Sequence, residues 1–184
     1  TGVMTVPSDG SVTTAKLGDS AVTTAKINDG SVTSAKLDSG VALGKVLQVL
    51  QNTHTFGFNT SSTSYVDTGM ATPSITPAST SSKFLVTFNP TAHGNNSAYS
   101  NVEANFAIYK TVGGSTSSVQ ENMNRFRFRD TGGMYDGTQI INLLISPSTT
   151  SSIVFKLYMK KINGLPYLNP NGSDMMTSTV MEIA

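Results

Sequence analysis

The spacing of apolar residues changes once along the chain, near residue 44. Before that point, residues 9–17, 19–27 and 29–37 have nearly the same sequence, with a period of ten. A Val, a Lys and a final Leu or Ile recur at the same place in each of them. Self-similarity at a fixed period is typical of repeat architectures. We predict a repeat region over residues 1–44, with repeats near 9–18, 19–28 and 29–38.

Each repeat holds too few apolar side chains to fold alone. Fixing the backbone of one residue costs about 1–2 kcal/mol, whereas burying one Val or Leu gains only about 1.5–3 kcal/mol. A disordered linker is the alternative, but a linker has no need of fixed spacing. We therefore predict an elongated stalk in which identical chains pack their apolar side chains along a common axis. The packing residues are Val12, Leu17, Val22, Ile27, Val32 and Leu37.

The polar residues of a repeat predict its local structure. Asp-Gly favours a turn, because glycine reaches positive φ freely and Asp bonds its own backbone. The Ser-Val-Thr that follows tolerates an extended conformation. Thr13, Thr23 and Thr33 are then expected to cap a short helical turn.

After residue 44 the period becomes two, which is typical of half-buried strands. Gly, Pro, Asn and Ser clusters separate the alternating segments, and 124–129 alternates Arg with Phe. Such short strands predict an all-β fold, an antiparallel β-sandwich of the jelly-roll type, over residues 45–184. The predicted strands are 45–51, 63–66, 74–76, 83–88, 103–110, 124–129, 139–145, 152–160 and 177–183.

Several segments carry a resemblance to a known class of proteins. These are the tandem Asp-Gly-Ser-Val-Thr-Thr-Ala-Lys-Leu repeats, and the segments 44–49, 79–86 and 181–184. Together they resemble bacteriophage tail fibres and related virion appendages. The resemblance implies a homotrimer located in the virion, attached to other virion proteins at one end. It also implies that residues 45–184 form a distal, β-rich head.

Composition narrows the partners and the chemistry. Twelve Lys or Arg against eleven Asp or Glu give a net charge of +1, which argues against nucleic acid as a partner. No apolar run approaches the roughly 20 residues that cross a bilayer, so no membrane insertion is expected. Cysteine is absent, which excludes disulfides and thiolate metal sites. We expect assembly into an oligomer to provide the stability that disulfides would otherwise supply.

Candidate catalytic groups are scattered. No two carboxylates share a motif of the kind that a glycosidase needs, and neither histidine lies in a nucleophile elbow. We expect His54 to be a surface strand residue and His93 to lie in a loop. A Ca²⁺ site at Asp136 or Asp174 is an open alternative. We therefore predict a protein that is not an enzyme and has no cofactor.

The alternating segment 124–129 is a candidate binding strand. Arg125, Arg127 and Arg129 share one face of it. One interpretation is a solvated edge whose charges discourage strand pairing, or pairing with Glu121 and Asp130 across a subunit contact. The other is a cationic patch for an acidic saccharide or a lipopolysaccharide phosphate, which Arg binds in a bidentate manner.

Three predicted loops, 91–100, 131–137 and 165–174, are further candidates. They combine amide, hydroxyl and aromatic groups, which suit sugar recognition but also serve ordinary turns. Their candidate receptor-binding residues are Asn95, Asn96, Tyr99, Tyr135 and Tyr167.

Two functions remain open at this point. The first is a structural virion protein, a tail-fibre-like trimer whose head attaches to a host-surface glycan or lipopolysaccharide. The second is a purely structural head fibre, capsid decoration or tail-assembly component without a receptor. A polysaccharide depolymerase is disfavoured because no paired-acid motif is present, and a bacterial adhesin would need a secretion route.

Overall fold

The computed structural model describes residues 12–37, 45–95, 101–129, 134–169 and 172–184. The chain divides into two compact units, residues 1–43 and 44–184. We call the first unit the repeat region and the second the head, and describe each by itself.

The repeat region has the same local structure in each described repeat. A backbone hydrogen bond closes a turn at Gly18–Ala21 (3.0 Å) and another at Asn28–Ser31 (2.9 Å). Ser20 and Gly30 occupy equivalent places with φ of 61° and 78°, as the Asp-Gly pattern predicts. Short 3₁₀ helices follow each extended piece: η1 (Thr14–Lys16), η2 (Thr24–Lys26) and η3 (Ser34–Lys36).

One detail of the repeat was predicted wrongly. Thr23 has the extended conformation of an N-cap, yet its side chain makes no capping hydrogen bond. A three-residue helix needs little capping, because its single turn is closed by the Lys26 N–H on the Thr23 carbonyl (2.9 Å). The lysine instead reaches back, and Lys26 Nζ donates to the Ala21 carbonyl at 2.7 Å. Lys36 Nζ donates to the Ser31 carbonyl in the same way, at 2.7 Å.

The head consists of antiparallel strands joined by turns and irregular segments. They are β1 (Val46–His54), β2 (Phe58–Asn59), β3 (Val66–Ala71), β4 (Lys83–Asn89), β5 (Thr91–Asn95), β6 (Asn101–Val112), β7 (Ser115–Gln120), β8 (Arg125–Arg129), β9 (Met134–Thr138), β10 (Ile141–Ile145), β11 (Ile153–Asn163), β12 (Pro166–Leu168) and β13 (Met176–Ile183).

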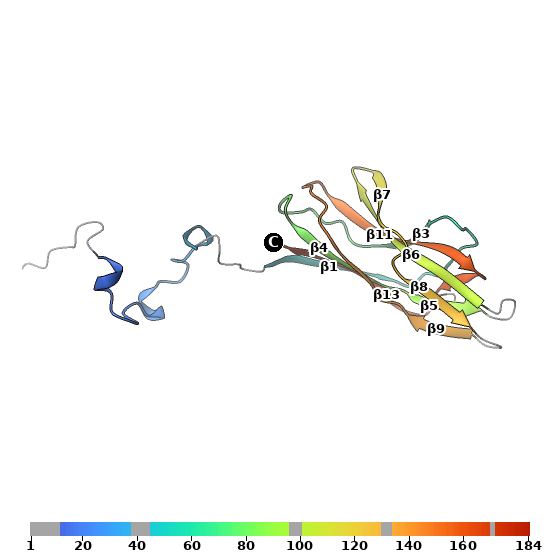
Figure 1. Ribbon diagram of the computed structural model, residues 1–184, viewed down its shortest axis with the longest axis horizontal. Helices are drawn as coiled ribbons and strands as arrows, with labels where there is room; N and C mark the ends of the chain where they lie inside the picture. The colour runs from blue at the N-terminus through green and yellow to red at the C-terminus, as the bar shows by residue number, and fades with distance from the viewer. Residues whose placement is uncertain (1–11, 38–44, 96–100, 130–133, 170–171) are drawn as a thin grey trace, which may run out of the picture. The chain divides into compact units, whose positions relative to one another are not determined.

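These strands form three sheets (Figure 1). Sheet A has the order β1-β13-β4-β10, and sheet B has the order β2-β12-β5-β9. Sheet C has the order β3-β11-β6-β7, with β8 also paired to β6. Sheet B repeats the order of sheet A with the neighbouring segments of the chain, so it continues sheet A beyond a break. At that break stands Pro90, which has no N–H for the ladder, while its carbonyl accepts the Gln139 N–H at 2.9 Å.

The core lies between sheets A and C. Alternate residues of β4, β11 and β13 are buried, as expected for strands with one face inward. Phe84 of sheet A packs on Phe155 of sheet C with ring centroids 6.0 Å apart. The prediction of an all-β fold with antiparallel strands is confirmed, and the strand order is compatible with a sandwich of the jelly-roll type. Residues 74–76 contribute only a single bridge, Ile75 to Ile153.

A carboxylate on β13 of sheet A is turned into the sandwich. Glu182 is fully buried, and it accepts hydrogen bonds from the Ala78 N–H (2.7 Å) and from Gln48 Nε2 (2.5 Å). Burial by itself raises the pKa of Glu182, but the hydrogen bonds from Gln48, Ser82 and Ala78 outweigh it and leave the pKa below its usual value. The charge is tolerated because its oxygens have donors.

His54 was predicted to lie on the surface, and that prediction is wrong. Its side chain is 9% exposed, because the end of β1 turns this residue toward the core opposite Met176. His54 Nε2 and Ser178 Oγ are 3.0 Å apart. Burial lowers the pKa of His54, more than the hydrogen bond involving Ala71 raises it.

The chain enters and leaves the head at one end. The Ala184 N–H donates to the Lys45 carbonyl at 3.0 Å, and Val46 pairs with Ile183. Within the head, β5 and β9 lie at the opposite end from the C-terminus (Figure 1).

Candidate binding surfaces of the head

Two arginines of β8 form ion pairs with a carboxylate of the same sheet. Arg125 and Arg127 both contact Glu103, which is 6% exposed and lies on the adjacent strand β6. The hydrogen bond from Arg125 is the main reason why the pKa of Glu103 is lowered, with Arg127 contributing further. Pairing with Glu121 and Asp130 across a subunit contact stays a prediction, and Asp130 and the side chain of Arg129 lie outside the described residues.

This pairing argues against the interpretation of β8 as a cationic patch that binds a ligand. A ligand phosphate would compete with a carboxylate that already engages both guanidinium groups. Two arginines and one glutamate leave a net charge of about +1 for the cluster at neutral pH. Among the described strands β8 pairs with β6 alone, and this edge position agrees with the interpretation of a charged sheet edge.

The three predicted loops contain strands instead, and the fold brings these strands together. β5, β9 and β12 are neighbours in sheet B. In their register, Tyr167 pairs with His93, Gly94 with Tyr135, and Asn95 with Met134. Asn95, Tyr135 and Tyr167 thus share one small sheet, whereas Asn96 and Tyr99 lie outside the described residues.

His93 of sheet B and two residues that follow β12 form a small polar cluster. His93 is buried within β5, so its predicted place in a loop is wrong. His93 Nε2 lies 3.3 Å from Asp174 Oδ2. Asn169 holds the backbone of Asp174 from both sides, donating from Nδ2 to its carbonyl (2.7 Å) and accepting its N–H at Oδ1 (3.1 Å). An open depression beside them is lined by Thr91, Gly137, Thr138, Ser173, Asp174 and Met175.

Neither metal nor membrane chemistry is indicated in the part of the chain that the structure describes. Within it, no group of three or more His, Asp or Glu residues is placed to hold a metal ion. The same residues include no helix that is long and apolar enough to span a bilayer.

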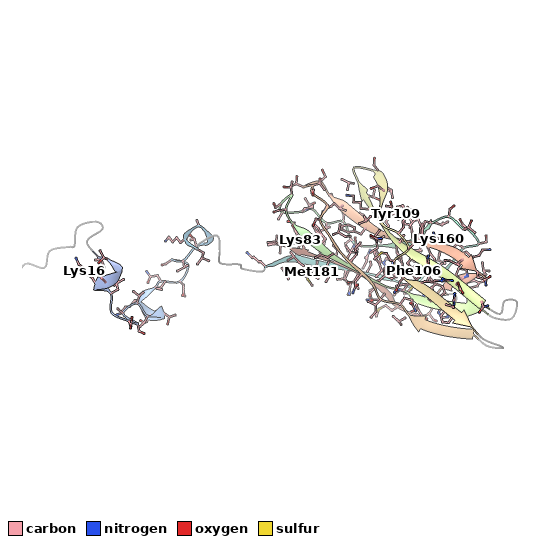
Figure 2. The ribbon with its side chains drawn as sticks, in the orientation of Figure 1. Lys16, Lys83, Phe106, Tyr109, Lys160 and Met181 are labelled. Atoms are coloured by element: carbon pink, nitrogen blue, oxygen red, sulfur yellow. The ribbon has the colours of Figure 1, made fainter. Side chains whose placement is uncertain are left out.

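The outer face of sheet C carries an aromatic group that the sequence analysis missed. The rings of Tyr109 and Tyr158 stack with centroids 3.9 Å apart and an interplanar angle of 21°. Tyr65 lies beside them, 6.3 Å from the Tyr109 ring, and Lys160 Nζ sits 4.4 Å from the centroid of Tyr65. Tyr109 and Lys160 are both labelled in Figure 2.

Polar groups surround these rings at hydrogen-bonding distance. Tyr65 Oη donates to Asn122 Oδ1 (3.0 Å) and accepts the Asn122 N–H (2.7 Å). Asn105 Nδ2 donates to the same Oδ1 at 3.0 Å, and Tyr109 Oη donates to Glu121 Oε1 at 2.8 Å. Burial and the bond to Glu121 raise the pKa of Tyr109 to about 12. We call this set the tyrosine surface; its residues are Tyr65, Asn105, Tyr109, Glu121, Asn122, Tyr158 and Lys160.

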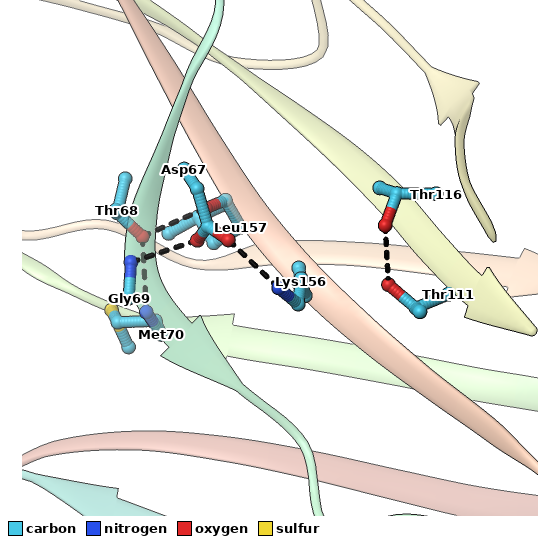
Figure 3. Close-up of polar contacts among 8 residues, drawn as sticks. All are labelled: Asp67, Thr68, Gly69, Met70, Thr111, Thr116, Lys156 and Leu157. Atoms are coloured by element: carbon cyan, nitrogen blue, oxygen red, sulfur yellow. Dashed lines mark hydrogen bonds and ion pairs between the residues drawn. The ribbon is translucent and has the colours of Figure 1, made fainter. Parts of the chain in front are cut away.

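An ion pair stiffens the adjoining strands. Lys156 Nζ contacts Asp67 Oδ2 at 2.9 Å, and Asp67 Oδ1 accepts the Gly69 N–H at 2.9 Å (Figure 3). Thr68 Oγ1 donates to the Leu157 carbonyl at 2.7 Å on the buried side of the same strand pair. The hydrogen bond from Lys156 to Asp67 raises the pKa of Lys156. The tyrosine surface therefore adjoins two strands that an ion pair and a side-chain hydrogen bond join to each other.

A signal for this surface was present in the sequence. In 152–160 the alternation places Lys156, Tyr158 and Lys160 on the face opposite Phe155 and Leu157. What alternation could not show is that Tyr109 of β6 stands beside Tyr158, because that depends on the register of two strands far apart in sequence.

Comparison with known proteins establishes no family. No family model and no curated protein matches the sequence. A solved structure of the VP2 subviral particle of infectious bursal disease virus matches with a TM-score of 0.37 and 15% identity, over 74% of this chain and 38% of that one. The Gx strain of the same virus gives a TM-score of 0.35 and 12% identity over 75% and 40%. The chain thus spans about two fifths of these proteins, and likeness at this level carries no argument about function.

Proposed function

We propose that this chain is a structural, non-enzymatic virion protein: a homotrimeric, fibre-like appendage whose head attaches to a host-surface glycan. The observation that carries the attachment role is the tyrosine surface. Stacked tyrosines supply rigid contact area at a low entropic cost, and amide and hydroxyl groups around them supply donors and acceptors for sugar hydroxyls.

The geometry favours recognition over catalysis. The polar groups of the tyrosine surface are already hydrogen-bonded to one another, as for Asn122 with Tyr65 and Asn105. A surface held in this way binds without first having to order its side chains. The carboxylates nearby, Asp67 and Glu121, are engaged by Lys156 and Tyr109.

The repeat region supports the trimer. In the single chain its apolar residues are exposed, for example Val12 by 55%, Val22 by 54% and Val32 by 53%. Each recurs ten residues after the last, so each repeat adds the same unburied group. Packing these side chains between chains removes them from water, at about 25 cal/mol for each Å² of apolar surface.

The first experiment measures the native mass of the full chain by light scattering and its binding to arrays of bacterial polysaccharides and lipopolysaccharides. We expect a trimer that retains one class of glycan. Tyr158→Ala is expected to weaken that binding by about tenfold, because one stacking contact is worth about 0.5–1.5 kcal/mol beyond its buried area and an appendage binds through several heads. Tyr158→Phe keeps the ring and is expected to bind nearly as the parent does.

Two controls separate the alternatives. Tyr167→Ala tests sheet B, and the triple substitution of Arg125, Arg127 and Arg129 by Ala tests the cationic strand. If either abolishes binding while Tyr158→Ala does not, the tyrosine surface is the wrong site. A trimer that binds none of the glycans favours the receptor-free structural role, and a monomer contradicts the appendage itself.

A further inference from the structure

The outer face of sheet A differs from an ordinary solvated sheet face. Every residue of its four strands is described, and the outward positions follow from their alternation with buried neighbours. Among these positions Lys83 alone carries a charge. The outward residues are Val49, Gln51, Thr53, Lys83, Leu85, Thr87, Asn89, Asn142, Leu144, Thr177, Thr179, Met181 and Ile183.

The apolar members of this face form a row across the whole sheet. Val49 pairs with Met181, Met181 with Leu85, and Leu85 with Leu144. The two outer members of the row, Val49 and Leu144, are 51% and 55% exposed. Residues directly opposite each other on antiparallel strands have adjacent side chains, so the row is a continuous apolar strip.

The next row is polar but uncharged. Gln51 pairs with Thr179, Thr179 with Thr87, and Thr87 with Asn142. Gln51 Nε2 already donates to Thr179 Oγ1 at 3.2 Å. Depletion of charged residues is what distinguishes the centre of a subunit interface from the rest of a protein surface.

The outer face of sheet C provides the contrast within the same head. It presents charged residues on four of its strands, and its tyrosines carry polar partners. The charged residues among its described side chains are Asp67, Glu103, Arg125, Arg127, Lys156 and Lys160. Two layers of one sandwich share a core and a solvent, so a difference in composition this large indicates a different neighbour on each outer face.

The position of the strip identifies that neighbour. Met181 and Lys83 lie toward the end of the head where the C-terminus is found (Figure 2). That end is also where the chain enters the head at Lys45. Leu37, the last apolar position of the repeats, is eight residues earlier, a span of at most about 28 Å. Stalks packed together therefore hold several copies of this face at high effective concentration.

We propose that the outer face of sheet A is the surface through which the heads of the trimer pack on one another, with the strip Val49–Met181–Leu85–Leu144 turned toward the common axis. This rests on the proposed trimer and assigns its interface in the head. The outer face of sheet C, with the tyrosine surface, is then left outward.

A labelling experiment on the full chain tests this assignment. Because the chain has no cysteine, one substitution introduces its only thiol. Leu85→Cys places it within the strip, and Val154→Cys places it at a half-buried, outward position of β11 in sheet C. In the native assembly we expect a maleimide to react at least about tenfold more slowly at position 85 than at 154, because an interface centre packs like a protein interior. Mild oxidation should cross-link subunits through position 85 only.

The outcomes are distinguishable from those of the proposed function. If the parent is a trimer and position 85 reacts as fast as position 154, without cross-linking, the head interface is wrong while the stalk trimer stands. A monomeric parent overturns both. Protection at 85 with cross-linking between subunits supports both.

A pair of charge substitutions supplies a second readout where a cysteine disturbs folding. Leu144→Lys puts a charge in the strip, and Ile162→Lys puts one at a comparably apolar position of β11, 40% exposed in the parent. We expect Leu144→Lys to raise the concentration at which the trimer dissociates by about tenfold or more, since an unpaired charge in an interface is costly. Ile162→Lys should leave it within about twofold of the parent. Equal effects of the two substitutions would contradict the assignment.

Discussion

The two outer faces of the sandwich show how one core supports two different surfaces. Sheet A presents uncharged threonines, amides and an apolar strip. Sheet C presents ion pairs, a stacked pair of tyrosines and a lysine over a third. The inward faces are alike, because both supply large side chains such as Phe84 and Phe155 to one core.

The difference in composition between the two outer faces is not required for folding, and it reflects what each face contacts. Strand pairing and the core require only the inward alternation and the backbone ladder. The outward positions are therefore free to match whatever covers them. A charged and aromatic face is suited to water and a polar ligand, whereas a face with a single charge and an apolar strip is suited to another protein surface.

The largest loss of stability is expected for a side chain that packs across the core between sheets A and C. Phe155→Ala removes a fully buried ring that packs on Phe84 across the core. We expect the free energy of unfolding to fall by about 3–5 kcal/mol. Urea unfolding followed by tyrosine fluorescence, to which tyrosines of sheets B and C both contribute, and by circular dichroism should give coincident transitions. Two separated transitions would show that the layers are not one cooperative unit.

An intermediate loss of stability is expected at acid pH, because acid protonates one buried carboxylate in each of sheets A and C. Glu182 in sheet A and Glu103 in sheet C both have a pKa below their usual value. A group with a lowered pKa in the folded state stabilises above its unfolded pKa and loses that contribution as pH falls through the folded pKa. We therefore expect stability to be level near neutral pH and to decline below about pH 4.5, the ordinary pKa of a Glu side chain.

Substitution separates the two carboxylates. Glu182→Leu leaves the Ala78 N–H without its acceptor, and an unpaired buried donor costs about 1–3 kcal/mol. It also removes one of the two acceptors of Gln48 Nε2, which keeps the Thr76 carbonyl at 3.0 Å. The remaining acid dependence should be weaker than in the parent. Glu121→Gln, at an exposed residue, is the control and should change the free energy of unfolding little. Urea titrations across the acid range would measure both, and an unchanged acid profile for Glu182→Leu would contradict the stated role.

The smallest effect is expected at the surface ion pair of sheet C. Lys156 and Asp67 are 30% and 35% exposed, so Asp67→Asn should lower the free energy of unfolding by at most about 1 kcal/mol. That loss should shrink further in high salt. Lys83→Gln on sheet A is the matched control and should be nearly neutral. A larger loss of free energy of unfolding for Lys83→Gln than for Asp67→Asn would contradict this prediction.

Much of the fold could be predicted from local patterns. The turn and helical turn of each repeat follow from residues that contact only near neighbours, such as Asn28 with Ser31. The long central strands follow from alternation, because each has one consistently buried face. The prediction that Thr23 caps its helical turn was wrong, because a single 3₁₀ turn has few free backbone donors for a cap to satisfy.

The candidate surfaces were harder to predict. Segments 91–95, 134–138 and 166–168 look like loops because they are short and rich in glycine, asparagine and proline, yet they are strands because each finds a neighbour in sheet B. Glu103 gave no sign of binding Arg125 and Arg127, and Tyr109 gave none of stacking on Tyr158. These contacts join residues on different strands.

The sequence by itself therefore determined the period-ten repeat, the change to alternating strands and the inward face of each long strand. These depend on interactions within a few residues and on the two-residue pleat. Only the tertiary structure decided that His54 is buried, that Glu103 pairs with Arg125 and Arg127, and that one outer face carries an apolar strip while the other is aromatic and charged. The physical reason is register: which residues stand side by side on a sheet is set by strand pairing over long sequence separations, and each pairing is stabilised by the core as a whole.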